Sequence, residues 1–235
     1  MVDEVKPLER KEGLVKRFFN PKPGDKMMTK RQFFENLADE WEQKHATPQE
    51  EENLQAVIQH FPLAPGQVVL DIGCGTGRLI PHLLPQLGPE GWLVEADFSF
   101  QMLSLGRTRS ASDQVLFLQS DAQALGLQDN LFDLIICLAL FPHLDHKLAA
   151  LLEFHRLLRP DGMLVIAHSL GRERLNKLHA QKSAVIRHDL LPAEAEMKQL
   201  LTRAGFKEII IIDTPEMYVV KAVAVATEAQ KDIWV

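Results

Sequence analysis

The feature of this chain that most constrains its fold is the glycine-rich stretch VVLDIGCGTGRL at residues 68–79. A short apolar run ends there in Gly73, Gly75 and Gly77, and apolar residues at helical spacing follow. A strand that ends in glycines and continues into a helix is typical of open α/β sheets, whose ligands bind beyond the carboxyl ends of the strands. Glycine has no Cβ to block the approach of a ligand to the backbone. The stretch therefore predicts both a fold class and the edge of the sheet that binds a ligand.

Short apolar runs alternate with amphipathic segments through the rest of the chain. Runs such as FDLIICLAL and GMLVIA are almost continuously apolar, as expected for parallel strands covered by helices on both faces. The sequence thus predicts a doubly wound α/β fold with a mostly parallel, seven-stranded sheet. The expected strands are 68–72, 92–96, 115–118, 132–138, 163–168, 208–213 and 217–225, and the expected helices between them are 77–87, 99–106, 145–158 and 193–204. Only a few residues join the last two strands, so these should pair antiparallel, which reverses the last strand.

Two amphipathic helices are expected before the sheet, one in the stretch TKRQFFENLADEWEQ and one near 48–60. The apolar residues at helical spacing in the first are Phe33, Phe34, Leu37 and Trp41. We expect an N-terminal segment and helical cap over 1–60 and the sheet domain over 61–235, together as a single globular unit.

Composition favours a small-molecule partner. The formal net charge is −6 and no run of Lys and Arg forms a basic stripe, so the chain lacks the electrostatic signature of nucleic-acid binding. Its longest apolar stretches are too short to span a bilayer. Its 2 cysteines, Cys74 and Cys137, support neither a disulfide framework nor a metal cluster. We expect a soluble cytoplasmic protein, monomeric or homodimeric, that binds neither nucleic acid nor a membrane.

The glycine spacing argues against a nucleotide-phosphate site. A dinucleotide fingerprint places its third glycine three residues after the second, but that position holds Arg78 when counted from Gly73 and Ile80 when counted from Gly75. The Gly-Lys-Ser or Gly-Lys-Thr ending of a phosphate-binding loop is also absent. A loop without phosphate chemistry that follows the carboxylate of Asp71 suits a ligand with positive charge.

The next two strands add carboxylates at the same edge. Asp97 ends GWLVEAD, where an acidic side chain can accept both hydroxyl groups of a ribose. Asp121 follows the third strand and could accept the exocyclic amine of adenine, while Ala122 leaves room for the ring. Together they indicate a ligand that contains adenosine.

These motifs resemble those of the class I S-adenosylmethionine-dependent methyltransferases, in the small-molecule group related to the quinone-biosynthesis enzymes. VLDIGCGTG, EADFS, SDAQAL, FDLIIC and LLRPDGMLVIAH follow the order and spacing of that family's motifs over residues 68–168. The resemblance implies a Rossmann-like methyltransferase fold, S-adenosylmethionine as cofactor and a small-molecule methyl acceptor. The expected cofactor-binding residues are Trp41, Asp71, Gly73, Cys74, Gly75, Thr76, Gly77, Asp97, Phe98, Met102, Asp121, Ala122 and Leu138.

Within this set, the family resemblance assigns Asp71 and the glycines to the methionine part of the cofactor. FFENLADEWE is similar to the family's entry helix, so Trp41 is expected to cover the cofactor, with a place in the core as the alternative. Cys74 stands where a small residue is needed, and packing alone is its alternative role. The connection 169–192 is long and rich in Arg, Lys and His, and it is the expected acceptor lid.

The histidines are the candidate catalytic residues. CLALFPHLDHK, after the fourth strand, lacks the Asn-Pro-Pro-aromatic and Pro-Cys signatures of base methylation. His143 could act as a base or clamp the acceptor, or it could be an ordinary loop residue. His168 and His179 are expected near it and complete the predicted catalytic set.

A transition-metal site is a further hypothesis for these histidines. His45, His143, His168 and His179 could meet over the methyl group, and several neutral imidazoles suit a divalent transition metal. An acid/base pocket for an organic acceptor and scattered surface residues are the alternatives.

The sequence therefore predicts an S-adenosylmethionine-dependent methyltransferase of small molecules. An adenine-dinucleotide oxidoreductase is disfavoured by the glycine spacing. A non-catalytic protein with the same fold, binding S-adenosylmethionine or handling metals, stays open because function resides in the site and not in the fold.

Overall fold

The computed structural model describes residues 28–45, 47–182 and 184–226, except the side chains of 39–45. Its centre is a seven-stranded sheet in the order β3-β2-β1-β4-β5-β7-β6. The strands are β1 Val68–Ile72, β2 Trp92–Asp97, β3 Val115–Gln119, β4 Phe132–Leu138, β5 Leu158–His168, β6 Phe206–Asp213 and β7 Tyr218–Ala224. Strand β7 runs antiparallel to both β5 and β6, and the other pairings are parallel. The predicted doubly wound fold with a reversed last strand is confirmed.

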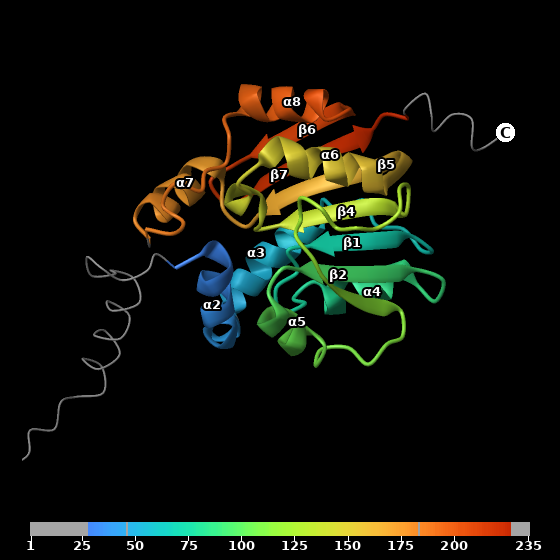
Figure 1. Ribbon diagram of the computed structural model, residues 1–235, viewed down its shortest axis with the longest axis horizontal. Coiled ribbons are helices and arrows are strands. Elements are labelled where there is room, and N and C mark those ends of the chain that lie inside the picture. Colours follow the sequence, from blue (N-terminus) through green and yellow to red (C-terminus); the bar gives the residue numbers. More distant parts are fainter. Residues whose placement is uncertain (1–27, 46, 183, 227–235) are drawn as a thin grey trace, which may run out of the picture.

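Helices cover both faces of the sheet (Figure 1). Val69 packs with α3 (Pro48–Ile58) and α4 (Ile80–Leu87) on one face. Its neighbours Leu70 and Ile72 pack with α6 (Lys147–Leu157) and α8 (Glu194–Arg203) on the other. Successive side chains of a strand point to opposite faces, so a strand buried on both faces reads as a continuous apolar run. Helix α5 (Phe100–Gly106) packs against β2 and β3.

The structure differs from the expected elements at the turns. Helix α4 begins at Ile80, later than the predicted 77, because the glycines before it adopt positive φ and interrupt helical geometry. Strand β5 begins at Leu158, earlier than expected, beside a register shift in its pairing with β4. The connection 169–192, for which no helix was predicted, contains α7 (Arg172–Ala180).

Two elements lie at the end of the sheet where the parallel strands finish (Figure 1). Helix α2 (Lys30–His45) is the predicted first cap helix, and α7 follows directly after β5. A short 3-10 turn, η1 (Phe141–His143), extends β4 at the same edge. The elements α2, η1 and α7 therefore lie at the edge of the sheet where cofactor and acceptor are expected to bind.

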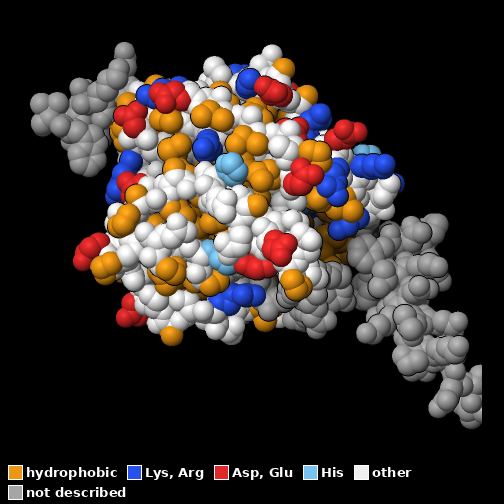
Figure 2. Space-filling model, turned by 180° about the vertical axis from the view of Figure 1, so that it is seen from behind, with side chains coloured by type: hydrophobic (Ala, Val, Ile, Leu, Met, Phe, Trp, Pro, Cys, Tyr) orange, Lys and Arg blue, Asp and Glu red, His pale blue; other side chains and the backbone are white. Residues whose placement is uncertain are grey.

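The surface carries charges of both signs. On the face turned away from the viewer of Figure 1, acidic and basic side chains are interspersed (Figure 2). None of the described helices combines the length and the apolar character that crossing a bilayer requires.

Candidate functional site

The loops after β1 and β2 hold each other at the carboxyl edge of the sheet. Gly73, Gly75 and Gly77 have φ angles of +74°, +55° and +70°, in the left-handed region that favours glycine. Asp97 accepts the backbone N–H of Gly75 through Oδ2 at 2.9 Å and that of Ser99 through Oδ1 at 2.8 Å. The glycine turn is therefore anchored to the carboxylate that is expected to bind a ribose.

Buried acids gather beneath this turn. Asp71 and Glu95 are partners in the β1–β2 register, and both side chains are buried. Burial, together with the charge of Asp97, raises the pKa of Asp71 to about 8. Burial and the charge of Asp71 also raise the pKa of Glu95 well above its usual value, and neither carboxyl oxygen of Glu95 has a hydrogen-bond partner among the described residues. Buried acids of this kind are stabilised by a nearby cation, so the site suits a positively charged ligand.

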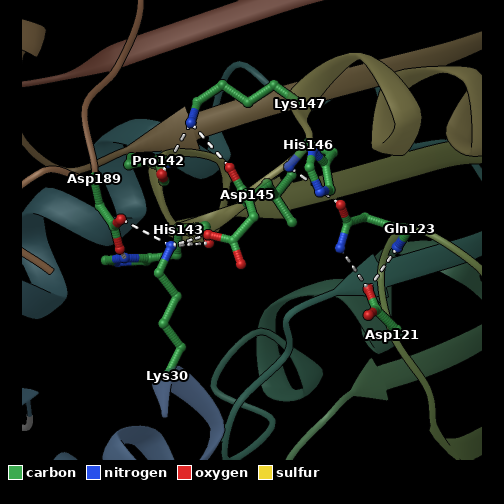
Figure 3. Close-up of polar contacts among 10 residues, drawn as sticks. Lys30, Asp121, Gln123, Pro142, His143, Asp145, His146, Lys147 and Asp189 are labelled. Atoms are coloured by element: carbon green, nitrogen blue, oxygen red, sulfur yellow. Dashed lines mark hydrogen bonds and ion pairs between the residues drawn. The ribbon is translucent and has the colours of Figure 1, made fainter. Parts of the chain in front are cut away.

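The third strand supplies an accessible carboxylate. Asp121 accepts hydrogen bonds from the backbone N–H of Gln123 at 2.9 Å and from its side-chain amide at 3.2 Å (Figure 3). Both bonds use Oδ1 of an exposed side chain, which leaves Oδ2 for a ligand. Gln123 in turn accepts the backbone N–H of His146, which ties this loop to the segment after η1. Ala122, next to Asp121, is buried.

The described residues predicted to bind the cofactor all lie at the ends of four neighbouring strands, β3, β2, β1 and β4, or in the segments that follow them. They are Asp71, Gly73, Cys74, Gly75, Thr76, Gly77, Asp97, Phe98, Met102, Asp121, Ala122 and Leu138. A Cβ built on Gly73 would lie 2.8 Å from the Leu140 side chain, whereas one on Gly75 would meet nothing closer than Met102 Sδ at 3.9 Å. Gly75 is therefore the glycine of these two at which the loop has room for a ligand. This space and the buried acids fit a sulfonium cofactor with a ribose.

The two cysteines have no exposed thiol. The Cys74 thiol donates to the Gly75 carbonyl at 3.6 Å, and burial raises its pKa well above the usual value. Cys137 is fully buried in β4, and burial raises its pKa as well. Because the thiolate is the reactive form, neither side chain is poised as a nucleophile.

Phe34 of α2 lies between Phe98 and His143. Its ring lies 6.0 Å from the ring of Phe98 and 5.1 Å from that of His143, both in edge contacts. The side chain of Trp41 lies outside the described part of the structure. Phe34 and Trp41 belong to the same helical pattern of apolar residues. The pattern therefore predicted an aromatic side chain near the site, but it could not distinguish which of the two reaches it.

His143 and Asp189 form a hydrogen-bonded pair in the site (Figure 3). The His143 Nδ1–H donates to Asp189 Oδ2 at 2.8 Å, and both side chains are largely buried. His179 of α7 donates through Nδ1 to the backbone carbonyl of Asp189 at 2.6 Å, and its ring centre lies 5.0 Å from that of His143. Because an ionised carboxylate and a carbonyl can only accept, each ring carries a proton on Nδ1 and, in its neutral form, presents the lone pair of Nε2.

His168 adds a third imidazole beside this pair. It ends β5 and is buried, and burial, with the neighbouring His143 and His179, lowers its pKa to about 3. Burial also lowers the pKa of His179, so both rings are neutral at pH 7. Tyr218, the partner of His168 in the β5–β7 register, is buried too. Neither His168 Nε2 nor the Tyr218 hydroxyl has a hydrogen-bond partner in the described chain, so each is a buried, unsatisfied polar group.

The metal hypothesis receives no support from this arrangement. Within the described residues, no group of three His, Cys, Asp or Glu side chains is arranged to hold a metal ion. The side chain of His45, the fourth predicted ligand, lies outside the described part of the chain.

Sequence reasoning missed four residues that the structure brings to the site. Lys30, Phe34, Asp189 and Tyr218 come from α2, the connection after α7 and the start of β7. Asp189 reaches His143 only because the chain folds back after α7, where Asn176 hydrogen-bonds both backbone groups of Leu191. No residue spacing in the sequence predicts that the chain folds back at this point.

The arginines of the connection 169–192 face other partners. Arg172 pairs with Asp213, and Arg174 donates to the Pro215 carbonyl at 3.0 Å. Both contacts tie the connection to the turn between β6 and β7.

Comparison with known proteins agrees with the fold. A methyltransferase-domain family matches residues 70–166. A ubiquinone/menaquinone biosynthesis C-methyltransferase of Coxiella burnetii is 37% identical over 113 residues, which cover 46% of this chain and 45% of the relative. The protein of that name from Shewanella frigidimarina is 30% identical over 171 residues, which cover 62% of this chain and 68% of the relative. This chain thus spans a little under half the length of the Coxiella relative.

A solved structure shows the same fold. The crystal structure of an S-adenosylmethionine-dependent methyltransferase from Aquifex aeolicus matches with a TM-score of 0.65 at 23% identity, covering 80% of this chain and 98% of the other. The fold and the glycine loop thus define a class I methyltransferase. The chain belongs to the family of class I S-adenosylmethionine-dependent methyltransferases and is similar to the ubiquinone/menaquinone biosynthesis C-methyltransferases. The family predicted from the sequence motifs is confirmed.

Proposed function

We propose that this chain transfers the methyl group of S-adenosylmethionine to a hydroxylated small molecule, with His143 as the base that deprotonates the acceptor. The observation that carries the proposal is the His143–Asp189 pair at the end of β4. It lies one strand from β1, whose glycine loop is the expected cofactor site.

The cofactor contacts follow from the edge of the sheet. Asp71 and the opening at Gly75 would hold the methionine part, Asp97 the ribose and Asp121 the adenine amine. When bound, S-adenosylmethionine supplies a methyl group already activated on a sulfonium, so the protein's main task is to align the acceptor and exclude water.

The base acts through Nε2 of His143. Asp189 accepts the hydrogen bond from Nδ1–H, which fixes the tautomer and orients the ring, and its charge stabilises the imidazolium that forms when Nε2 takes a proton. A base is needed where the acceptor atom must lose a proton to become nucleophilic. The arrangement therefore favours hydroxyl, enol or phenol acceptors over thioethers and tertiary amines.

Hydroquinones are the acceptor class we favour. Deprotonation of a phenolic hydroxyl raises the electron density of the ring carbons, which is what methylation at carbon requires. The relatives named as quinone-biosynthesis C-methyltransferases make this the first class to test. Among the described residues, neither His168 Nε2 nor the Tyr218 hydroxyl has a hydrogen-bond partner, and both would bind polar groups of the ring. The connection 169–192, which carries His179 and Asp189, would close over the acceptor.

The test is a methyl-transfer assay with labelled S-adenosylmethionine and a panel of hydroquinones and simple phenols. We expect C-methylated product from the wild type and a loss of kcat of roughly 10²–10⁴-fold in His143→Gln. Calorimetry should show unchanged affinity of that variant for S-adenosylhomocysteine, because His143 does not line the glycine loop.

Three outcomes would contradict parts of the proposal. If the protein did not bind S-adenosylmethionine, the assignment of the glycine loop as the cofactor site would be wrong. Tight cofactor binding without turnover of any hydroquinone or phenol would remove the acceptor class and favour a non-catalytic binding protein. Loss of turnover after treatment with a chelator, together with a stoichiometric metal in elemental analysis, would favour the metal hypothesis over a base.

A further inference from the structure

Lys30 of the cap helix α2 reaches the catalytic pair from outside the sheet domain (Figure 3). Its Nζ lies 2.8 Å from Asp189 Oδ1 and 2.6 Å from Asp145 Oδ1, and it donates to the His143 carbonyl at 2.9 Å. One ammonium group thus contacts the backbone of His143 and the carboxylate that orients its ring. These residues are brought together only by the tertiary structure, since 113 positions separate Lys30 from His143.

The two oxygens of Asp189 have different partners. Oδ1 faces Lys30 and Oδ2 accepts from His143, so the carboxylate is held at both ends. Burial alone would raise the pKa of Asp189, but His143 and Lys30 together bring it below the usual value. Without Lys30, Oδ1 would lose its charged partner and the carboxylate could rotate away from the His143 ring.

The loop that carries His143 is fixed by ammonium groups from two elements. Lys147 of α6 donates to the carbonyls of Pro142 and Leu144, at 3.1 Å and 3.0 Å, and Lys30 takes the carbonyl between them. Lys147 belongs to the sheet domain, whereas Lys30 arrives with α2. The three successive carbonyls of residues 142–144 therefore all accept a hydrogen bond from an ammonium group only when α2 lies over the site.

We propose that Lys30 is a positioning residue through which α2 completes the His143–Asp189 base. The inference rests on the function proposed above. Helix α2 also carries Phe34, whose ring contacts Phe98 on the cofactor side and His143 on the acceptor side. This one helix therefore contacts both the cofactor edge, through Phe34, and the base, through Lys30.

The charges around His143 come from every side of the site. Lys30 lies on α2, Asp145 and Lys147 follow η1, His168 ends β5, His179 lies on α7, and Asp189 lies in the connection after α7. Replacing Lys30 by a neutral residue removes a positive charge that opposes protonation of the pair. A base positioned this way should lose kcat and shift its pH profile, whereas a merely structural contact would change stability alone.

The experiment compares Lys30→Met, Lys30→Arg and Arg31→Met in the full-length protein. Arg31 is the matched control, because it is the next residue of α2 and pairs within the helix with Glu35, away from His143. We expect Lys30→Met to lose kcat roughly tenfold to a hundredfold with little change in KM, and its acidic limb to move to higher pH. Lys30→Arg should recover part of kcat, and Arg31→Met should behave as the wild type.

A second measurement needs no acceptor. Ring nitrogen shifts of His143, assigned with His143→Gln, report which nitrogen carries the proton. We expect the Nδ1–H form in the wild type and in Arg31→Met, and a mixture of tautomers in Lys30→Met. If no hydroquinone or phenol is methylated, the proposed function fails but the tautomer still decides the role of Lys30.

Two results would overturn the inference. One is an identical His143 tautomer in Lys30→Met and the wild type. The other is an equal effect of Lys30→Met and Arg31→Met on kcat and on the pH profile. Thermal unfolding of each variant identifies a loss of fold, and in that case the comparison is made with Lys30→Arg, which should show a smaller shift of the tautomer in the same direction.

Discussion

At the scale of single residues, a substitution at Gly75 should affect folding stability and cofactor affinity to different extents. Its φ of +55° is tolerable for alanine at a cost of about 1 kcal/mol, and an added Cβ would meet only Met102 Sδ at 3.9 Å. We expect Gly75→Ala to fold with that small loss of stability and to bind S-adenosylmethionine at least about tenfold more weakly, because the methyl group enters the space left for the ligand. Calorimetry and urea unfolding of the same preparation measure the two effects.

Gly66→Ala is the matched control for this change. Gly66 also has a positive φ, +81°, with nothing within 4 Å of its Cβ position, but it precedes β1 at the opposite edge of the sheet. It should lose similar stability and keep full affinity for the cofactor. Equal affinities of the two variants would show that the loop does not use the space at Gly75.

At the scale of elements, the paired strands β1 and β2 bury two acidic side chains, Asp71 and Glu95, next to each other. Because the pKa of Glu95 is raised in the folded state, the folded protein holds a proton that the unfolded chain releases above pH 4.5. Stability should therefore fall as pH rises from 4.5 until Glu95 ionises in the folded state. We expect Glu95→Gln to match the wild type in acid and to gain on it by up to about 1.4 kcal/mol per pH unit above that point.

Urea unfolding between pH 4.5 and 8 checks this prediction, with the exposed Glu90→Gln as control. A constant difference between Glu95→Gln and the wild type across that range would show that Glu95 ionises as readily in the folded state as in the unfolded chain. The buried Glu95 carboxylate would then not require a cationic ligand to stabilise it.

At the scale of the whole molecule, the histidine site imposes the opposite dependence on pH. The pKa of His168 is lowered to about 3 in the folded state, so below pH 6.5 the unfolded chain takes up a proton that the folded protein does not. Stability should fall as pH decreases from 6.5, by up to about 1.4 kcal/mol per pH unit. We expect His168→Gln to flatten this acid limb, as measured by urea midpoints from pH 4 to 7.

His146→Gln is the control, because its side chain is exposed and its contact to Gln123 uses the backbone. If stability falls equally steeply with decreasing pH in both variants, a group other than His168 causes the loss of stability in acid. Between pH 4.5 and 6.5 the slope from His168 opposes the slopes from Glu95 and Asp71, both of whose pKa values are raised in the folded state.

Much of the fold could be predicted because its signals are local. The apolar runs gave the strands, the short connection between the last two gave the antiparallel pair, and the motifs after β1 to β4 gave the cofactor edge. The start of α4 was missed because three positive-φ glycines delay helical geometry until Ile80. Helix α7 was missed because its residues look like a polar connection when its buried contacts are unknown.

The sequence by itself determined the family, the glycine turn and the carboxylates at Asp71, Asp97 and Asp121, because each is fixed by residues close together in the chain. Only the tertiary structure decided the acceptor side. Lys30, His143, His179 and Asp189 come from separate elements, and their hydrogen bonds depend on how α2 and the connection after β5 lie against the sheet. Hydrogen bonds are satisfied over a few ångströms in space, and no spacing along the chain records which distant side chains will meet.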